Sequence, residues 1–123
     1  MPKTRIYIIL MAIFCAAVFC KTSSTSECQN VNGQIALWNG WPPCIRIESN
    51  DKKYVYGIET NDKGIPDSDF MPDTLWKKLL SDDSLSGTFC IKLTGGQTTV
   101  PYDERVIKYV KIVRYKVINK WGK

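Results

Sequence analysis

Hydrophobic and polar residues alternate along much of the chain beyond residue 32, with the period of two that is typical of half-buried β-strands. We expect a first strand at 33–38, and the Asn-Gly pair at 39–40 that follows it is a strong hairpin turn signal. Second and third strands are expected at 44–48 and 53–59. Gly57 in the third strand predicts a bulge or a bend. Together these segments predict a three-stranded meander.

The period changes to that of a helix after residue 72. Leu75 and Leu79 are four positions apart, as are Trp76 and Leu80, so one face of a short helix over 74–80 is apolar. Asp73 precedes this stretch and is the expected N-cap. The sequence therefore predicts a helix of about two turns after the third strand.

Two further strands are expected after the helix. Residues 88–93 alternate again, and 94–97 contain two glycines that are typical of a turn. Residues 105–121 are rich in Val, Ile and Tyr, which favour strands. The alternation changes phase within this last segment, which predicts a kink near 110–112.

The expected order of elements is β-β-β-α-β-β. This is the order of an OB-fold, a small five-stranded Greek-key barrel with a helix between the third and fourth strands. We therefore predict a mostly β, OB-fold-like barrel, and the alternative is an antiparallel sheet with one helix against a face. The predicted core residues are Ile35, Leu37, Ile45, Ile47, Val55, Leu75, Leu79, Phe89 and Ile91.

The N-terminus has the pattern of an export signal. Lys3 and Arg5 precede an uncharged apolar stretch at 6–20, which is shorter than the roughly 20 residues of a membrane-spanning helix. We predict a signal peptide over 1–20, a flexible segment over 21–31 and one β-barrel domain over 32–123. The protein is then exported, either periplasmic or secreted. A lipid anchor on Cys20 and a retained N-terminal anchor are the two minority alternatives, and membrane contact is expected only through such an anchor.

The cysteines agree with export. Cys28, Cys44 and Cys90 lie outside the predicted signal, so an oxidising compartment would allow one disulfide and leave one thiol. Three pairings are possible. We favour Cys28–Cys90, because it would join the N-terminal segment to the body of the domain.

The composition excludes several chemistries. The chain has no His, which removes Ser-His-Asp and Cys-His catalysis and every zinc site that needs an imidazole. No Cys-x-x-Cys pair is present. Asp67, Asp69 and Asp73 resemble calcium ligands in composition only, since no Glu closes the loop. We expect no cofactor, no metal and no catalytic residues.

A resemblance is carried by the stretch Gly33-x-Ile-x-Leu-Trp-Asn-Gly-x-Pro-x-x-Ile-Arg-Ile47, followed by a Tyr/Gly strand, a short helix and Gly87-x-Phe. The chain resembles a family of small exported bacterial proteins of uncharacterised function with a similar Leu-Trp-Asn-Gly-x-Pro stretch after the signal. The resemblance implies an OB-like fold and brings no activity.

Two stretches are candidate binding sites. Trp38 and Trp41 flank the predicted turn, where they either present flat apolar surfaces to a sugar or peptide or close one end of the barrel. In the last strand, basic residues are interleaved with aromatic ones, which suits an anionic ligand, although Lys on an edge strand also blocks pairing. The candidate residues of this strand are Lys108, Tyr109, Lys111, Arg114, Tyr115 and Lys116.

These observations predict a non-enzymatic binding module. The expected partner is a protein or an anionic component of the cell envelope, and nucleic acid is disfavoured by the export signal. The alternative function is a small secreted enzyme or an enzyme inhibitor. An enzyme would need two converging carboxylates, or a free Cys beside a base.

Overall fold

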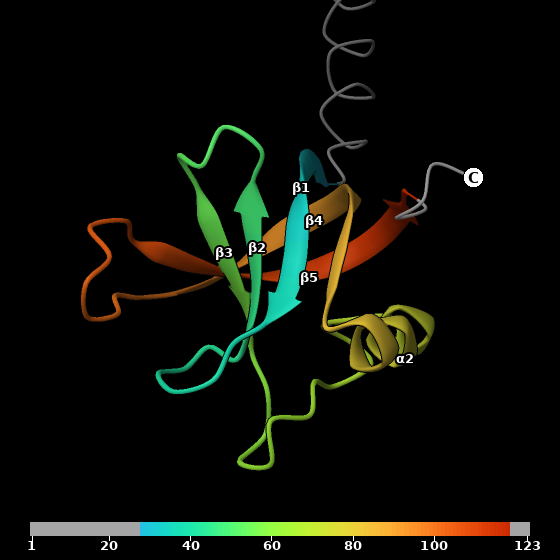
Figure 1. Cartoon of the computed structure of the whole chain (residues 1–123), viewed down its shortest axis with the longest axis horizontal. Coiled ribbons are helices and arrows are strands. Elements are labelled where there is room, and N and C mark those ends of the chain that lie inside the picture. The colour runs from blue at the N-terminus through green and yellow to red at the C-terminus, as the bar shows by residue number, and fades with distance from the viewer. Residues whose placement is uncertain (1–27, 119–123) are drawn as a thin grey trace, which may run out of the picture.

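A computed structural model describes residues 28–118, which form a closed five-stranded β-barrel with one helix (Figure 1). The predicted fold class is thereby confirmed. The signal peptide predicted for 1–20 lies outside the described residues. The elements are β1 (Gln29–Leu37), β2 (Ile45–Ser49), β3 (Val55–Ile58), α2 (Asp73–Asp82), β4 (Ser84–Thr98) and β5 (Ile107–Val117).

The barrel closes because β1 pairs on both of its edges. It lies antiparallel to β2, with Ile35 opposite Ile47, and antiparallel to β4, with Ile35 opposite Leu85. β5 lies between β4 and β3, and its pairing with β3 is parallel. The chain therefore crosses from β3 to β4 through α2 before β5 fills the remaining gap.

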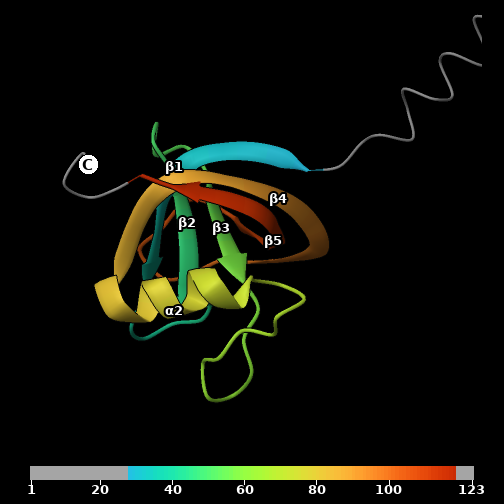
Figure 2. The ribbon, with the colours of Figure 1, turned by 90° about the vertical axis from the view of Figure 1, so that its right-hand side faces the viewer.

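Apolar residues of the alternating positions fill the barrel. Ile35, Ile47 and Phe89 are fully buried, and Leu75 and Leu79 of α2 cover the lower end of the barrel (Figure 2). Each side chain removed from water in this way stabilises the fold by roughly 1.5–3 kcal/mol. All of the predicted core residues are buried except Leu37, which is partly buried against the same cluster.

The helix differs from the prediction at both ends. Pro72 occupies the N-cap position without a side-chain cap hydrogen bond, so the expectation that Asp73 is the cap was wrong. Asp73 is instead the first helical residue, where its carboxylate suits the helix dipole and lies 3.1 Å from Nζ of Lys77. The helix continues to Asp82 and ends at Asp83, which has a positive φ and donates its N–H to the carbonyl of Leu79.

The predicted turn at 94–97 is not a turn. β4 runs without interruption from Ser84 to Thr98, and the glycines lie in a bulge, because Leu93 pairs with Val110 while Gln97 pairs with Lys108. Glycines suit a bulge for the same reason that they suit a turn, since both need unusual backbone angles.

The start of β1 and the position of the irregularity in β5 also differ from the prediction. β1 begins at Gln29, so residues 29–31 belong to a strand and not to the predicted flexible segment. In β5 the register skips Val113, because Cys90 pairs with Arg114 and Ile91 with Ile112. The kink predicted near 110–112 therefore exists, one residue further along the chain.

A disulfide joins Cys28 to Cys90, with the two Cα atoms 5.3 Å apart. This is the pairing that the sequence favoured, and it fixes the start of β1 to the middle of β4. Cys44 remains a half-buried thiol. Within the described part of the chain, we find no helix with the length and apolar character needed to cross a membrane.

Candidate functional site

The loop between β1 and β2, residues 38–44, is hereafter called the tryptophan loop. Trp38 and Trp41 are 46% and 64% exposed. Of the two roles considered for them, closing one end of the barrel is therefore wrong, because α2 does that with Leu75 and Leu79. The loop instead presents two large aromatic side chains to solvent, a surface of the kind that anchors ligands and partners.

Arg46 of β2 holds this loop in place. Its Nε donates a hydrogen bond of 2.9 Å to the carbonyl of Pro43, and its Nη2 donates one of 2.6 Å to the carbonyl of Trp41. The guanidinium carbon also lies 4.6 Å from the ring centroid of Trp38. One side chain thus ties three loop residues to the outer surface of the barrel.

Arg46 is the single polar or charged side chain that is buried among residues 28–118. Burial lowers the pKa of its guanidinium, while the nearby Asp103, Cys44 and Tyr109 act in the opposite direction. The usual pKa of arginine lies so far above neutrality that Arg46 remains charged. A buried charge is costly unless its hydrogen bonds are made. The burial of Arg46 therefore depends on the loop carbonyls, and the position of the loop depends on Arg46.

A glycine in β3 allows the loop to lie close to the sheet. A Cβ atom at Gly57 would collide with the side chain of Pro43 and would crowd Ile107. Gly57 pairs regularly with Arg46, so the predicted bulge is not present there. Its role is to leave room for the ring of Pro43.

A hollow of ≈ 280 Å³ opens beside the loop. Its lining residues are Pro42, Pro43, Ile58, Glu59, Thr60 and Tyr109. Burial is the main cause that raises the pKa of the Tyr109 phenol; Glu59 adds to the effect and Arg46 opposes it. The Tyr109 phenol is therefore influenced by both an acidic residue of the hollow and the buried cation.

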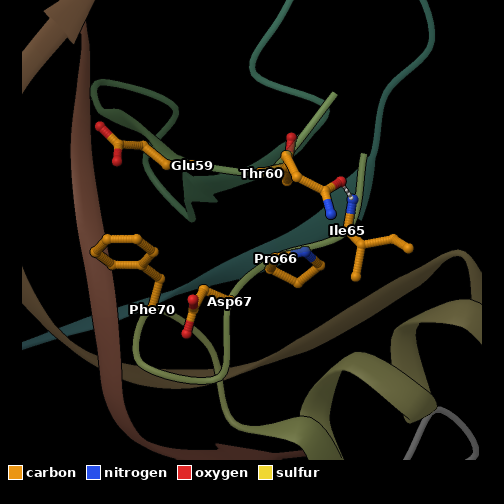
Figure 3. A pocket seen from close by; sticks show the side chains of 7 residues that line it. Glu59, Thr60, Ile65, Pro66, Asp67 and Phe70 are labelled. Atoms are coloured by element: carbon orange, nitrogen blue, oxygen red, sulfur yellow. Dashed lines mark hydrogen bonds between the residues drawn. The ribbon is translucent and has the colours of Figure 1, made fainter. Parts of the chain in front are cut away.

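A second hollow, also of ≈ 280 Å³, continues from the first and shares Glu59 and Thr60 with it (Figure 3). Its other lining residues are Asn61, Ile65, Pro66, Asp67 and Phe70. We call the two hollows together the proline groove. The groove combines proline and aromatic surfaces with acidic groups, which is a mixture that can bind an extended peptide or a sugar chain.

The walls of the second hollow are held by short-range hydrogen bonds. Oδ1 of Asn61 accepts the N–H groups of Lys63 and Ile65 at 2.9 and 3.0 Å. Oδ1 of Asp67 accepts the N–H of Asp69 at 2.9 Å. These are the local bonds by which Asn and Asp shape turns, and they account for the polar residues of this loop without a ligand.

The structure separates the candidate residues of the last strand. Tyr109 lines the proline groove, whereas Tyr115 lies against α2, where its hydroxyl is 2.6 Å from Oγ1 of Thr74 and its ring is 5.8 Å from Nζ of Lys78. Arg114 points toward the disulfide, with Nη2 3.7 Å from Sγ of Cys90. Tyr115 therefore lies away from the outward-facing cations of β5, whereas Tyr109 shares the outward side of the strand with Lys111.

The remaining candidates Lys108, Lys111 and Lys116 lie along β5, the first and last of them exposed. The sequence identified the tryptophans and the lysines as candidate binding residues but did not identify Arg46, because the alternation of β2 predicts a solvent-facing side chain at that position. The available signal was its place shortly after the two prolines of the loop.

The acidic residues of loop 59–72 do not form a metal site. Among residues 28–118, no group of three or more Cys, Asp or Glu side chains is arranged to hold a metal ion.

Comparisons of the chain with family models, with curated proteins and with solved structures found no match. The functional argument therefore rests on the geometry of the molecule itself.

Proposed function

We propose that this protein is an exported, non-enzymatic binding module that engages a protein or another cell-envelope component through the tryptophan loop and the adjoining proline groove. The observation that carries the proposal is the pair of exposed tryptophans whose loop is fixed by the buried Arg46. Large exposed aromatic groups on a fixed backbone lose little conformational entropy when a partner binds.

Export is supported by two independent features. The apolar stretch at 6–20 behind Lys3 and Arg5 has the pattern of a signal peptide. The Cys28–Cys90 disulfide is the kind of bond that persists in oxidising compartments and is rare in the cytosol. The resemblance to small exported bacterial proteins supports the same assignment.

One observation bears on the alternative of a small enzyme. Glu59 and Asp67 line the same hollow, but their carboxylates point in different directions (Figure 3), and one oxygen of Asp67 is engaged by the backbone. Two carboxylates that share a reaction must face a common substrate atom. The binding role is therefore the better supported of the two.

Site-specific photo-cross-linking in the exporting cell tests the proposal. Benzoylphenylalanine replaces Trp41, and in a control chain it replaces Tyr102, which is fully exposed on the β4–β5 connection. We expect a discrete cross-linked product from position 41 and none of the same mass from position 102. The product should disappear when Trp38→Ala is added, because that change removes half of the aromatic surface.

Two results would contradict the proposal. Identical products from positions 41 and 102 would show that the tryptophan loop is not a specific site. A position-41 product that survives Trp38→Ala and an additional Tyr109→Ala would show that the partner does not use the loop and groove together.

A further inference from the structure

A third hollow lies at the opposite end of the barrel from the tryptophan loop. β1 pairs with β4 from Gln29 onward but reaches β2 only at Gly33, which is opposite Ser49. The carbonyl of Asn32 accepts the N–H of Asn50 at 2.9 Å, so only the first three residues of β1 stand apart from the β2–β3 turn. The start of β1 and this turn are both at the top of the barrel in Figures 1 and 2. The space between them is a hollow of ≈ 350 Å³, hereafter called the amide hollow.

Uncharged amides dominate the lining of this hollow. Gln29, Asn30, Asn32 and Asn50 all contribute, and all four are exposed. Each amide offers two donors and an acceptor, which matches the hydroxyl groups of a sugar, since a hydroxyl both donates and accepts. Oδ1 of Asn32 accepts a hydrogen bond of 2.6 Å from Oγ1 of Thr88, which leaves its NH₂ group to donate to a ligand.

An aromatic platform completes the hollow. The rings of Tyr54 and Tyr56 are stacked, with centroids 6.5 Å apart and planes 21° apart. Tyr56 is buried and Tyr54 is 58% exposed, so a fixed ring supports an exposed one. The apolar C–H face of a pyranose packs against such a ring, while its hydroxyls reach the surrounding amides.

The one acid in this lining is Asp51, and its charge is already partly compensated. Its Oδ1 accepts hydrogen bonds from the hydroxyl of Ser49 and from the N–H of Lys53, and these bonds are the main causes that lower its pKa. Its second oxygen remains able to accept a sugar hydroxyl. Asp51 therefore remains ionised and serves the hollow as an acceptor for hydroxyl groups.

The hollow adjoins a sheet face without acidic residues. β1, β4 and β5 contain no Asp or Glu. Across these strands Asn30 lies beside Cys90 and Arg114, and Asn32 lies beside Thr88 and Lys116. Neighbouring strands are about 4.8 Å apart and paired residues share a face, so each cation lies roughly 10 Å from an amide of the hollow.

Like charges also lie opposite one another on this face, since Lys92 pairs with Lys111. We call the outward surface that carries Lys111, Arg114 and Lys116 the basic face. Among residues 28–118, none of these three cations forms an ion pair with a carboxylate.

We propose that the amide hollow and the basic face together bind an acidic oligosaccharide. One sugar ring stacks on Tyr54 and is hydrogen-bonded by Asn30, Asn32 and Asn50. The carboxylate or sulfate groups of the following sugars lie along the basic face against Arg114 and Lys116. This site is separate from the tryptophan loop, so it does not depend on the function proposed above.

The direct test is calorimetric titration of the full chain, with the Cys28–Cys90 bond intact, against three defined probes. Hexagalacturonate supplies both sugar and charge, its methyl ester supplies the same sugar without charge, and hexaglutamate supplies charge without sugar. We expect hexagalacturonate to bind about tenfold or more tightly than either control, because each control loses one of the two sets of contacts. Its affinity should fall as salt screens the basic face.

Variants then separate the two parts of the site. Tyr54→Ala should weaken hexagalacturonate by about tenfold, a loss in line with an aromatic contact, whereas Tyr54→Phe keeps the ring and should retain binding. Arg114→Gln with Lys116→Gln should weaken hexagalacturonate and leave the methyl ester unchanged. Lys63→Gln, which removes an exposed cation elsewhere, is the matched control and should change nothing.

Several outcomes would overturn the assignment. Hexaglutamate that binds as tightly as hexagalacturonate would mean that the basic face attracts any polyanion. An unaffected Tyr54→Ala variant would mean that the amide hollow takes no part. Absence of saturable binding to both hexagalacturonate and a sulfated hexasaccharide, or preferential binding to phosphatidylglycerol vesicles, would also exclude an acidic oligosaccharide site.

Discussion

The two outer faces of the barrel differ in whether other groups of the protein bind their cationic side chains. Over β2 and β3, Arg46 is bonded to two loop carbonyls, and Arg105 is paired with Asp103 at 2.9 Å and with Glu48 at 2.8 Å. On the basic face, Arg114 and Lys116 have no carboxylate partner within residues 28–118. The same residue type is structural on one face and is presented to solvent on the other.

The difference comes from the loops. The tryptophan loop and the β4–β5 connection both fold over β2 and β3, where Val100 packs with Val55 and Ile107. No loop covers the outer surface of β1, β4 and the C-terminal half of β5 within the part of the chain that the structure describes (Figure 2). A barrel face that its own loops cover has its charges satisfied internally, and the uncovered face is left for external partners.

The largest expected effect concerns the bond that fixes β1 to the uncovered side. Reduction of Cys28–Cys90 should lower the free energy of unfolding by about 4 kcal/mol, because the bond closes a long loop in the unfolded chain. Urea unfolding with and without dithiothreitol measures the change. Cys44→Ser keeps the bond and should behave as the parent does. An unchanged midpoint after complete reduction would refute the stabilising role.

Arg46→Ala should lower the free energy of unfolding by about 3 kcal/mol, because one buried and one partly buried carbonyl lose a charged donor. Arg114→Gln on the basic face should change the free energy of unfolding by no more than about 0.5 kcal/mol, as surface substitutions do. Parallel urea titrations compare the two. Equal losses in the free energy of unfolding of the two variants would contradict the distinction between a structural cation and a solvent-exposed one.

Gly57→Ala should destabilise the fold by about 2 kcal/mol, because the added methyl group meets Pro43 and Ile107 and forces the tryptophan loop outward. Gly96→Ala is the matched control, since its nearest neighbour is Cδ2 of Tyr109 at 3.3 Å, which can move. Thermal unfolding by circular dichroism measures both. A neutral Gly57→Ala would mean that the loop does not rest on the sheet.

Asp103→Asn should have the smallest effect, about 1 kcal/mol or less, because the Arg105 pair is partly exposed to solvent. Hydrogen bonds from Arg105 lower the pKa of Asp103. The pair therefore stabilises the fold above the usual carboxyl pKa, and this contribution is lost as pH falls through the lowered value. Unfolding at neutral pH and at about pH 3 should show a difference between parent and variant that shrinks in acid. A difference that grows in acid would contradict this assignment.

The barrel could be predicted from the sequence because its signals are local. Alternation in β1, β2 and β4 marks the inward residues directly, and Leu75 with Leu79 marks the covering face of α2. The turn predicted at 94–97 failed because glycine serves turns and bulges equally well. Only the pairing with β5 decides between them, and the glycines themselves do not report that pairing.

The sites were less predictable for the same reason. Trp38 and Trp41 could be found from their turn, but the burial of Arg46 depends on how the loop folds back over β2. The amide hollow brings the start of β1 next to the β2–β3 turn, and each of these segments separately has only the composition of a polar edge. Long-range pairing creates both features, and the period of a single strand does not report it.

Backbone ¹⁵N relaxation of the tryptophan loop tests most directly whether Arg46 fixes a preformed site. In the parent chain, the amides of residues 38–41 and of Cys44 should have order parameters near 0.85, as in the neighbouring strands, and Arg46→Ala should lower them below about 0.6. Order parameters below about 0.6 in the parent itself would contradict the account, because the tryptophans would then not be held in place.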